Sequence, residues 1–146
     1  MKTVLFLCTG NFYRSRFAEE LFNDLAIREG LAWRAGSRAL ALERGVNNIG
    51  TISPFALSAL AERGVPVRDG GRTPTQCSAQ DLEAADHIVA LKETEHRPLM
   101  RARYPAFEAR VEYWEVHDID IAPPQLALSL IDRQIAALLV QLRRRL

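Results

Sequence analysis

The sequence predicts a single α/β domain over residues 1–146, built on a four-stranded parallel sheet with helices on both faces. Three observations point to this fold. Short apolar segments alternate with longer segments of helical periodicity. The first apolar segment is continuous, as in a strand that is covered on both faces. No internal repeat, low-complexity tract or linker divides the chain, and strands that alternate with helices form parallel sheets with right-handed crossovers.

Four segments have the composition of strands. Residues 3–8 form the continuous apolar run TVLFLC, which is typical of a central strand. Three more strands are predicted at residues 31–37, 86–92 and 110–119. Ligands of such sheets bind outside the carboxyl ends of the strands, so side chains at these ends are the first candidates for a functional site.

Helical periodicity follows the first strand. Phe17, Leu21, Phe22 and Leu25 recur at helical spacing, and Gly30 suits the position just after a helix. Residues 95–104 form a segment that is either short helix or irregular. Three further helices are predicted. The first is capped by Ser53, has Pro54 in its first turn and ends at Gly64, and the second is a short helix capped by Ser78. The third is a long helix that follows Pro123 and Pro124, and its last turn contains Arg143 to Arg145.

Composition narrows the classes of function. The formal net charge is +1, so no overall basic field indicates binding to nucleic acid or to an anionic membrane. The N-terminal apolar run is too short for a signal peptide, and no stretch reaches the roughly 18 apolar residues of a membrane-spanning helix. Cys8 and Cys77 are few and far apart, which fits a reducing compartment. We therefore expect a soluble cytoplasmic protein that binds neither nucleic acid nor membranes.

The segment CTGNFYRS, residues 8–15, leaves the first strand and enters the first helix. Backbone N–H groups at a helix N-terminus form a cradle for anions, which the helix dipole strengthens. Gly10 lets the backbone come close to an anion, and Asn11 tolerates left-handed backbone geometry. Arg14 adds a planar fork that can hold two oxygens of a phosphate-like group. The segment therefore predicts an oxyanion site.

Cys8 lies at the carboxyl end of the first strand, inside this cradle. The positive field favours its thiolate form, and Ser15 can donate a hydrogen bond to the sulfur. A thiolate beside a phosphate cradle is a nucleophile directed at phosphorus. The loop lacks the Gly-Lys-Ser/Thr ending of a nucleotide-binding P-loop. From these residues alone, Cys8 as a buried core cysteine and Arg14 as a surface charge remain an open alternative.

The run VLFLCTGNFYRSRFAEELF resembles the low-molecular-weight protein tyrosine phosphatases, whose signature is C-x5-R-S/T near the N-terminus. The likeness continues in RAGSRA, ISPFALSALAERGV and DLEAADHIVALKETEH, and so covers essentially the whole chain. The resemblance implies hydrolysis of a phosphorylated protein or small phosphoester without a cofactor. It implies that Cys8 forms a phosphocysteine and that Arg14 clamps the phosphate. The loop residues that it implies around the phosphate are Thr9, Gly10, Asn11, Phe12, Tyr13 and Ser15.

The same resemblance implies a general acid late in the chain, where the family has an aspartate that is usually followed by proline. The matching stretch is WEVHDIDIAPP. Asp118, at the end of the last predicted strand, is the favoured acid, and Asp120 is the alternative. Neither precedes a proline, and Ile119 and Ile121 stand where the family often has aromatic residues. A preference for phosphotyrosine therefore stays open.

A second departure lies inside the loop. Tyr13 occupies the place where many relatives have a cysteine that captures the oxidised nucleophile as a disulfide. Cys77 is the only other thiol, and we expect it to be a bystander. We therefore expect Cys8 to be less well protected against peroxide than the nucleophile of two-cysteine relatives.

Two other functions stay open at this point. A phosphate- or phosphoprotein-binding module with weak turnover would keep the cradle and tolerate the altered acid loop. A thiol enzyme similar to thioredoxin-coupled arsenate reductases would need two further cysteines, which residues 89–100 lack. No His, Cys or carboxylate pair has metal-site spacing, so no metal is expected.

Overall fold

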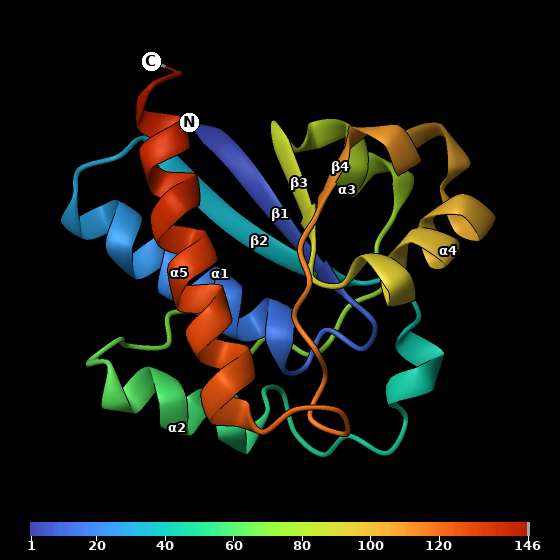
Figure 1. Ribbon diagram of the computed structural model, residues 1–146, viewed down its shortest axis with the longest axis horizontal. Coiled ribbons are helices and arrows are strands. Elements are labelled where there is room, and N and C mark those ends of the chain that lie inside the picture. Colours follow the sequence, from blue (N-terminus) through green and yellow to red (C-terminus); the bar gives the residue numbers. More distant parts are fainter. Residues whose placement is uncertain (146) are drawn as a thin grey trace.

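The computed structural model describes residues 1–145 and contains one parallel sheet of four strands with the order β2-β1-β3-β4 (Figure 1). The strands are β1 (Lys2–Cys8), β2 (Trp33–Ala39), β3 (His87–Ala90) and β4 (Val111–Tyr113). The predicted sheet is therefore confirmed. Because β1 pairs with both β2 and β3, the chain reverses its winding direction beside β1. Open α/β sheets bind ligands at such a reversal, and Cys8 is the last residue of β1.

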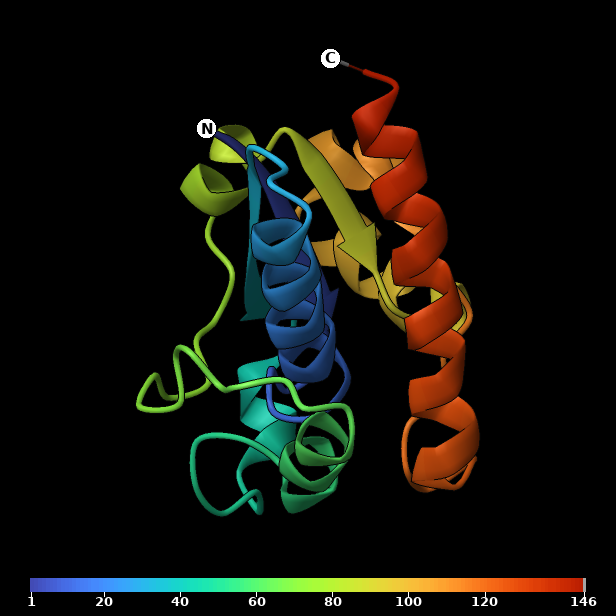
Figure 2. The ribbon, with the colours of Figure 1, turned by 90° about the vertical axis from the view of Figure 1, so that its left-hand side faces the viewer.

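Helices cover both faces of the sheet (Figures 1 and 2). They are α1 (Arg14–Arg28), α2 (Pro54–Glu62), α3 (Ala79–Ala84), α4 (Glu93–Arg103) and α5 (Pro124–Arg143), with 3-10 turns at Leu42–Gly45 and Pro105–Arg110. The helices α1, α2 and α5 pack together on one face, and α3 and α4 lie on the other. This two-sided arrangement agrees with the fold predicted from the sequence.

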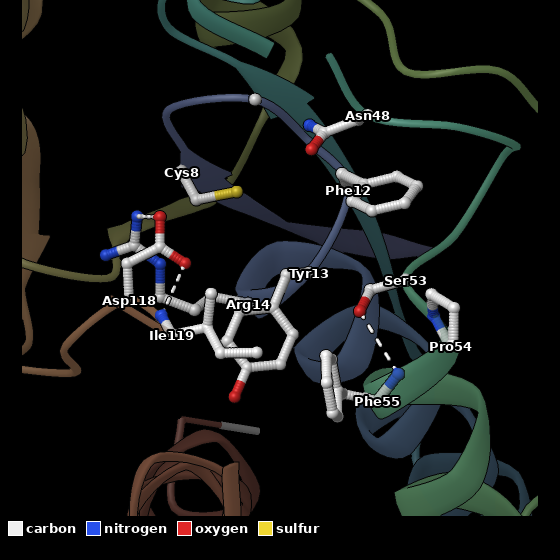
Figure 3. A pocket seen from close by; sticks show the side chains of 11 residues that line it. Cys8, Phe12, Tyr13, Arg14, Asn48, Ser53, Pro54, Phe55, Asp118 and Ile119 are labelled. Atoms are coloured by element: carbon white, nitrogen blue, oxygen red, sulfur yellow. Dashed lines mark hydrogen bonds and ion pairs between the residues drawn. The ribbon is translucent and has the colours of Figure 1, made fainter. Parts of the chain in front are cut away.

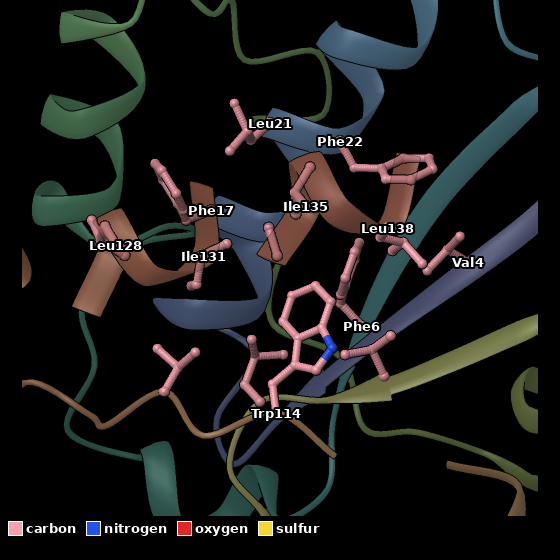
Figure 4. Close-up of a cluster of buried hydrophobic side chains, with 14 of the residues drawn as sticks. Val4, Phe6, Phe17, Leu21, Phe22, Trp114, Leu128, Ile131, Ile135 and Leu138 are labelled. Carbon is pink, nitrogen blue, oxygen red and sulfur yellow. The ribbon is translucent and has the colours of Figure 1, made fainter. Parts of the chain in front are cut away.

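The continuous apolar run of β1 supplies both cores. Val4 and Phe6 face the cluster made with α1 and α5, whereas Leu5 and Leu7 face the cluster made with α3 and α4. The Phe6 ring meets the Phe22 ring edge-on, with 6.1 Å between the centroids (Figure 4). Since successive side chains of a strand point to opposite faces, only a strand covered on both sides needs an unbroken apolar sequence.

The first helix ends as predicted, but the second strand starts later than predicted. Gly30 has a φ of 67°. Its N–H donates to the Ile27 carbonyl at 3.2 Å, and the N–H of Leu31 donates to the Ala26 carbonyl at 2.9 Å. This pair of bonds is a Schellman motif, which uses the Leu31 N–H for the helix end. The predicted strand start at residue 31 is therefore wrong, and β2 begins at Trp33.

The caps of the next two helices are confirmed. Ser53 accepts a hydrogen bond from the N–H of Phe55 at the start of α2. Ser78 and Asp81 form a reciprocal capping box at the start of α3. Both are local side chain–backbone arrangements, which is why the sequence alone could reveal them.

The third strand is shorter than predicted. It ends at Ala90 rather than at Lys92, because Lys92 is already the N-cap of α4. The segment predicted as short helix or irregular structure, residues 95–104, belongs to a regular helix that starts at Glu93 and includes Pro98. The predicted strand was too long because it included Lys92, which caps this helix.

The fourth strand is also much shorter than the predicted segment 110–119, since β4 ends at Tyr113. The chain still follows the end of β3, because the N–H of Trp114 donates to the Ala90 carbonyl and the N–H of Val116 donates to the Leu91 carbonyl. Asp118 is therefore in a loop beyond the sheet, and its predicted place at a strand end is wrong.

The long C-terminal helix is confirmed, although it ends at Arg143 and the final Leu146 lies outside the described residues. Among the helices of residues 1–145, only α5 is long enough and apolar enough to cross a membrane, as judged by length and composition alone. The expectation that no stretch of the chain is apolar over such a length is therefore wrong. Ile131, Ile135 and Leu138 of this helix are buried in the core beside α1 (Figure 4). Its apolar length therefore serves packing.

Candidate active site

A pocket of about 270 Å³ opens at the carboxyl end of β1 (Figure 3). The loop between β1 and α1, the start of α2 and the loop before α5 contribute its walls. The lining residues include Cys8, Gly10, Phe12, Tyr13, Arg14, Phe55, Asp118 and Ile119. Six of the predicted site residues therefore line one cavity: Cys8, Gly10, Phe12, Tyr13, Arg14 and Asp118. Thr9, Asn11, Ser15 and Asp120 are not among its lining residues. Asp118 reaches the cavity from more than 100 residues away in sequence.

The loop from Cys8 to Arg14 has the backbone that a cradle requires. Asn11 adopts a left-handed conformation with a φ of 52° and is fully buried. A Cβ atom at Gly10 would lie 3.3 Å from the Asn48 side chain, so a larger residue there would crowd the neighbouring loop. No side chain of the described residues caps α1. The first N–H groups of this helix can therefore donate to an anion.

The predicted contact between Ser15 and Cys8 is present, with 2.9 Å between Oγ and Sγ. The Asn11 side-chain amide also donates to Ser15 Oγ at 2.9 Å. Because Asn11 supplies a donor to that oxygen, the Ser15 hydroxyl proton can turn toward the sulfur when Cys8 is a thiolate. The pair is arranged to stabilise a negative sulfur.

Asn11 is itself held by residues that the sequence analysis missed. Its amide nitrogen donates to Ser37 Oγ at 2.9 Å, and its side-chain oxygen accepts from Arg72 at 3.1 Å and from the N–H of Thr75 at 3.2 Å. Arg72 also contacts the buried Glu19 carboxylate at 2.7 Å. Helical periodicity places Glu19 away from the apolar face of Phe17 and Leu21, so the sequence contained no signal for its burial in this network.

Arg14 is almost fully buried, with 2% of its side chain exposed. One terminal nitrogen donates to the Val116 carbonyl at 3.0 Å. The other donates to the Glu95 carboxylate at 2.6 Å and lies 3.4 Å from Asp118. Burial disfavours the charge, but the negative charges of Cys8, Asp118 and Glu95 outweigh burial and raise the pKa of Arg14. The surface-charge alternative for Arg14 is wrong.

Neither Glu95 nor His96 was predicted as a site residue. The Glu95 carboxylate accepts hydrogen bonds from Thr9 at 2.7 Å and lies 2.6 Å from His96 Nε2. Burial raises the pKa of Glu95, but hydrogen bonding from His96 and the charge of Arg14 lower it more, so the net pKa lies well below its usual range. Burial also lowers the pKa of His96.

The structure distinguishes the two candidate acids. Asp118 lines the pocket and approaches Arg14, whereas Asp120 is exposed and lies outside the lining residues. The carboxylate of Asp118 also accepts from the N–H of Ile119 at 2.8 Å, which fixes the side chain within its turn. This geometry favours Asp118.

Neither Tyr13 nor Cys77 is suited to form a disulfide with Cys8. The Tyr13 hydroxyl is buried without a hydrogen-bond partner among residues 1–145, and burial, with the Asp118 charge, raises its pKa to about 12. Cys8 pairs with Ala39, which in turn bridges to Gln76 on its other side. Two strand spacings therefore separate Cys8 from the Cys77 region, about 10 Å. A disulfide requires Cα atoms within about 7 Å, so the two thiols are placed too far apart.

No group of three or more His, Cys, Asp or Glu side chains in the described part of the chain could hold a metal ion. The site instead combines a thiol, a guanidinium, a carboxylate and free backbone N–H groups around one cavity. These groups suit phosphoryl transfer through the thiol.

The family model described as low molecular weight phosphotyrosine protein phosphatase matches residues 3–142. The chain belongs to this family. The family identification and the fold class made from the sequence are therefore confirmed, and with them the assignment to the cysteine-dependent protein phosphatases.

Individual relatives of this phosphatase are more distant. It is 34% identical over 91 residues to the low molecular weight protein-tyrosine-phosphatase YfkJ of Bacillus subtilis, an alignment that covers 62% of this chain and 56% of YfkJ. The chain is also 29% identical over 108 residues to the protein-arginine-phosphatase of the same organism. That alignment covers 74% of this chain and 67% of the arginine phosphatase. The crystal structure of YfkJ matches with a TM-score of 0.85 and 26% identity, over 99% of this chain and 96% of that one.

Proposed function

We propose that this phosphatase hydrolyses phosphomonoesters of phosphorylated proteins through a phosphocysteine on Cys8, with Arg14 as the phosphate clamp and Asp118 as the general acid. One observation carries the proposal. The Cys8 thiol, the Arg14 guanidinium and the Asp118 carboxylate meet in one pocket at the carboxyl end of β1 (Figure 3).

The first step is transfer of the phosphoryl group to sulfur. The Cys8 thiolate attacks phosphorus while the N–H groups of the cradle and the Arg14 guanidinium hold the phosphate oxygens. The bond between phosphorus and the leaving oxygen breaks, and the Asp118 carboxyl group gives its proton to that oxygen. The Ser15 hydroxyl, 2.9 Å from the sulfur, stabilises the thiolate before the attack.

The second step is hydrolysis of the phosphocysteine. Water attacks phosphorus, its proton passes to the Asp118 carboxylate, and the bond between sulfur and phosphorus breaks. Phosphate leaves and the Cys8 thiolate is restored. The solved structure of a relative, the YwlE arginine phosphatase, is of a mutant with a phosphorylated active-site serine in place of the cysteine. That protein offers a precedent for the covalent intermediate proposed here.

The walls of the pocket support an aromatic substrate. Phe12, Tyr13, Phe55 and Ile119 line it beside Cys8. Apolar and aromatic walls with a few polar groups at the base suit an aryl ring attached to a phosphate. Phosphotyrosine is therefore the first candidate, and phosphoarginine is the second because the chain is 29% identical to a protein-arginine-phosphatase over 74% of its length.

A panel of substrates tests the proposal. With matched peptides that carry phosphotyrosine, phosphoarginine or phosphoserine, kcat/KM should be highest for phosphotyrosine. Arg14→Ala should lower kcat by about 10³-fold, whereas the exposed Arg101→Ala should not change it. Tight binding of vanadate with negligible turnover of every ester would instead identify a phosphate-binding module.

We also propose that residues 1–146 act as one soluble domain in the cytoplasm, without a metal or cofactor and without binding nucleic acid or membranes. Support comes from the two free thiols, which suit a reducing compartment, and from the burial of the apolar side of α5. Purification of the full chain, followed by metal analysis and cell fractionation, tests these points.

A further inference from the structure

We propose that Glu95 is a positioning residue for catalysis, and that it acts by fixing the orientation of Arg14. The inference rests on the proposed function, in which Arg14 clamps the transferred phosphoryl group. Glu95 is not among the residues that line the pocket, whereas Arg14 is. The effect of Glu95 is transmitted by Arg14.

Two anchors define the plane of the Arg14 guanidinium. The Val116 carbonyl accepts from one terminal nitrogen at 3.0 Å, and the Glu95 carboxylate accepts from the other at 2.6 Å. A guanidinium has five N–H donors, so these two anchors leave donors for a phosphate. Figure 3 shows the Arg14 side chain beside Asp118, below the Cys8 sulfur. Without the Glu95 anchor, that nitrogen would keep only the longer 3.4 Å contact with Asp118.

The Glu95 carboxylate is itself held in place. His96 Nδ1 accepts from the N–H of Lys92 at 3.0 Å, so the ring proton is on Nε2, which faces Glu95 at 2.6 Å. The Thr9 hydroxyl donates to the same carboxylate oxygen at 2.7 Å. His96 is fully buried, so the orientation of its ring is fixed by packing.

Thr9 and Arg14 stand at the two ends of the loop that follows Cys8. Glu95 contacts both, from the first turn of α4 on the other side of the sheet. One carboxylate thereby ties together the beginning and the end of the phosphate cradle. This link sets the geometry of the cradle, in addition to any stability that it gives the fold.

The kinetic consequence falls on kcat. A clamp that is misaligned by about 1 Å costs on the order of 10²-fold in rate, because its hydrogen bonds tighten in the transition state. We expect Glu95→Ala to lower kcat by about 10²-fold, with a smaller change in KM. Glu95→Gln keeps an oxygen that can accept from Arg14, so it should recover at least about tenfold of that loss.

The matched control is Glu93→Ala. Glu93 lies in the same turn of α4, pairs with Arg97 at 2.7 Å and is half-exposed. An exposed pair of this kind contributes little, so kcat should stay within about twofold of the wild type. Thermal unfolding of each variant identifies a loss that comes from misfolding.

A double-mutant cycle with Arg14→Ala decides the proposal. If Glu95 acts through Arg14, Glu95→Ala should cause no further loss of kcat in that background. Losses that multiply in the double variant would overturn the proposal, as would a Glu95→Ala variant with wild-type kcat. Should Glu95→Ala not fold, the cycle is made with Glu95→Gln, and the same two outcomes apply. Dependence of wild-type turnover on Cys8 is measured separately, so a failure of the proposed function is distinguished from a failure of this inference.

Discussion

The two cysteines of this phosphatase are buried to the same extent but lie in opposite surroundings. Cys8 is 3% exposed and Cys77 is 4% exposed. Cys8 borders the pocket, with the Ser15 hydroxyl 2.9 Å from its sulfur and Arg14 nearby. Cys77 belongs to the apolar cluster under α3 and α4, where burial, with the charge of Asp81, raises its pKa to about 12. Burial of a thiol alone therefore says nothing about its reactivity.

The helices that follow the two cysteines also differ at their N-termini. Ser78 and Asp81 close a capping box at the start of α3, so side chains already satisfy its N–H groups, and a negative charge lies near Cys77. No side chain of the described residues caps α1, and a positive charge, Arg14, stands at its first position. An uncapped helix start beside a cation is an anion site, whereas a capped one is only a helix start.

The largest expected effect separates the two thiols directly. Cys8→Ser should lower kcat for an aryl phosphate by about 10⁴-fold or more, because it removes the nucleophile. Cys77→Ser should leave kcat within about threefold, since Cys77 is outside the pocket. Steady-state assays of both purified variants check this, and equal losses would remove the distinction between the two sites.

A smaller effect separates the two carboxylates of the acid loop. Asp118→Asn should lower kcat by about 10²- to 10³-fold, because general acid catalysis contributes on that order. Asp120→Asn should change kcat by less than about twofold, as expected for an exposed residue away from the pocket. The reverse order in the same assay would assign the acid to Asp120.

Alkaline unfolding tests the environment of Cys77. Its folded pKa of about 12 lies above the ordinary value of 9.0, so the unfolded chain loses this proton first. The contribution to stability is complete below about pH 9 and is lost as the pH rises toward 12, by up to about 1.4 kcal/mol per pH unit. Denaturant titrations between pH 9.5 and 11 should show a flatter decline for Cys77→Ala than for the wild type. Parallel declines would contradict the apolar environment.

The smallest effect concerns oxidation. Because about two strand spacings separate the thiols, Cys77→Ser should be inactivated by peroxide at the wild-type rate and recover to the same extent with dithiothreitol. Tyr13→Cys should increase the recoverable fraction, since it places a thiol inside the loop. A Cys8–Cys77 disulfide found by peptide mapping would show that the two regions communicate.

Local patterns in the sequence predicted much of this molecule. The cradle from Cys8 to Ser15 and the cap of Ser53 depend on neighbouring residues, and both are present in the structure. The length of β4 was not predictable in this way, because the strand ends where its partner β3 gives way to α4. Local patterns describe a segment, but pairing depends on where the neighbouring segment stops.

The supports of the site depend on tertiary packing in the same way. Glu95 contacts Arg14 across 81 positions of sequence, and Arg72 contacts Asn11 across 61. Neither residue differs from the many other charged residues of the chain until the fold brings it to the loop. Asp118 was found through the family resemblance, and its loop position beyond β4 became clear only in the structure.

Trapping of the covalent intermediate tests the central claim most directly. An aryl phosphate has a good leaving group, so Asp118→Asn should slow hydrolysis of the phosphocysteine more than its formation. Acid quenching during turnover by this variant, followed by peptide mapping, should place one phosphoryl group on the peptide that contains Cys8. Turnover with no phosphoryl group on Cys8, or with the group on another residue, would contradict the mechanism.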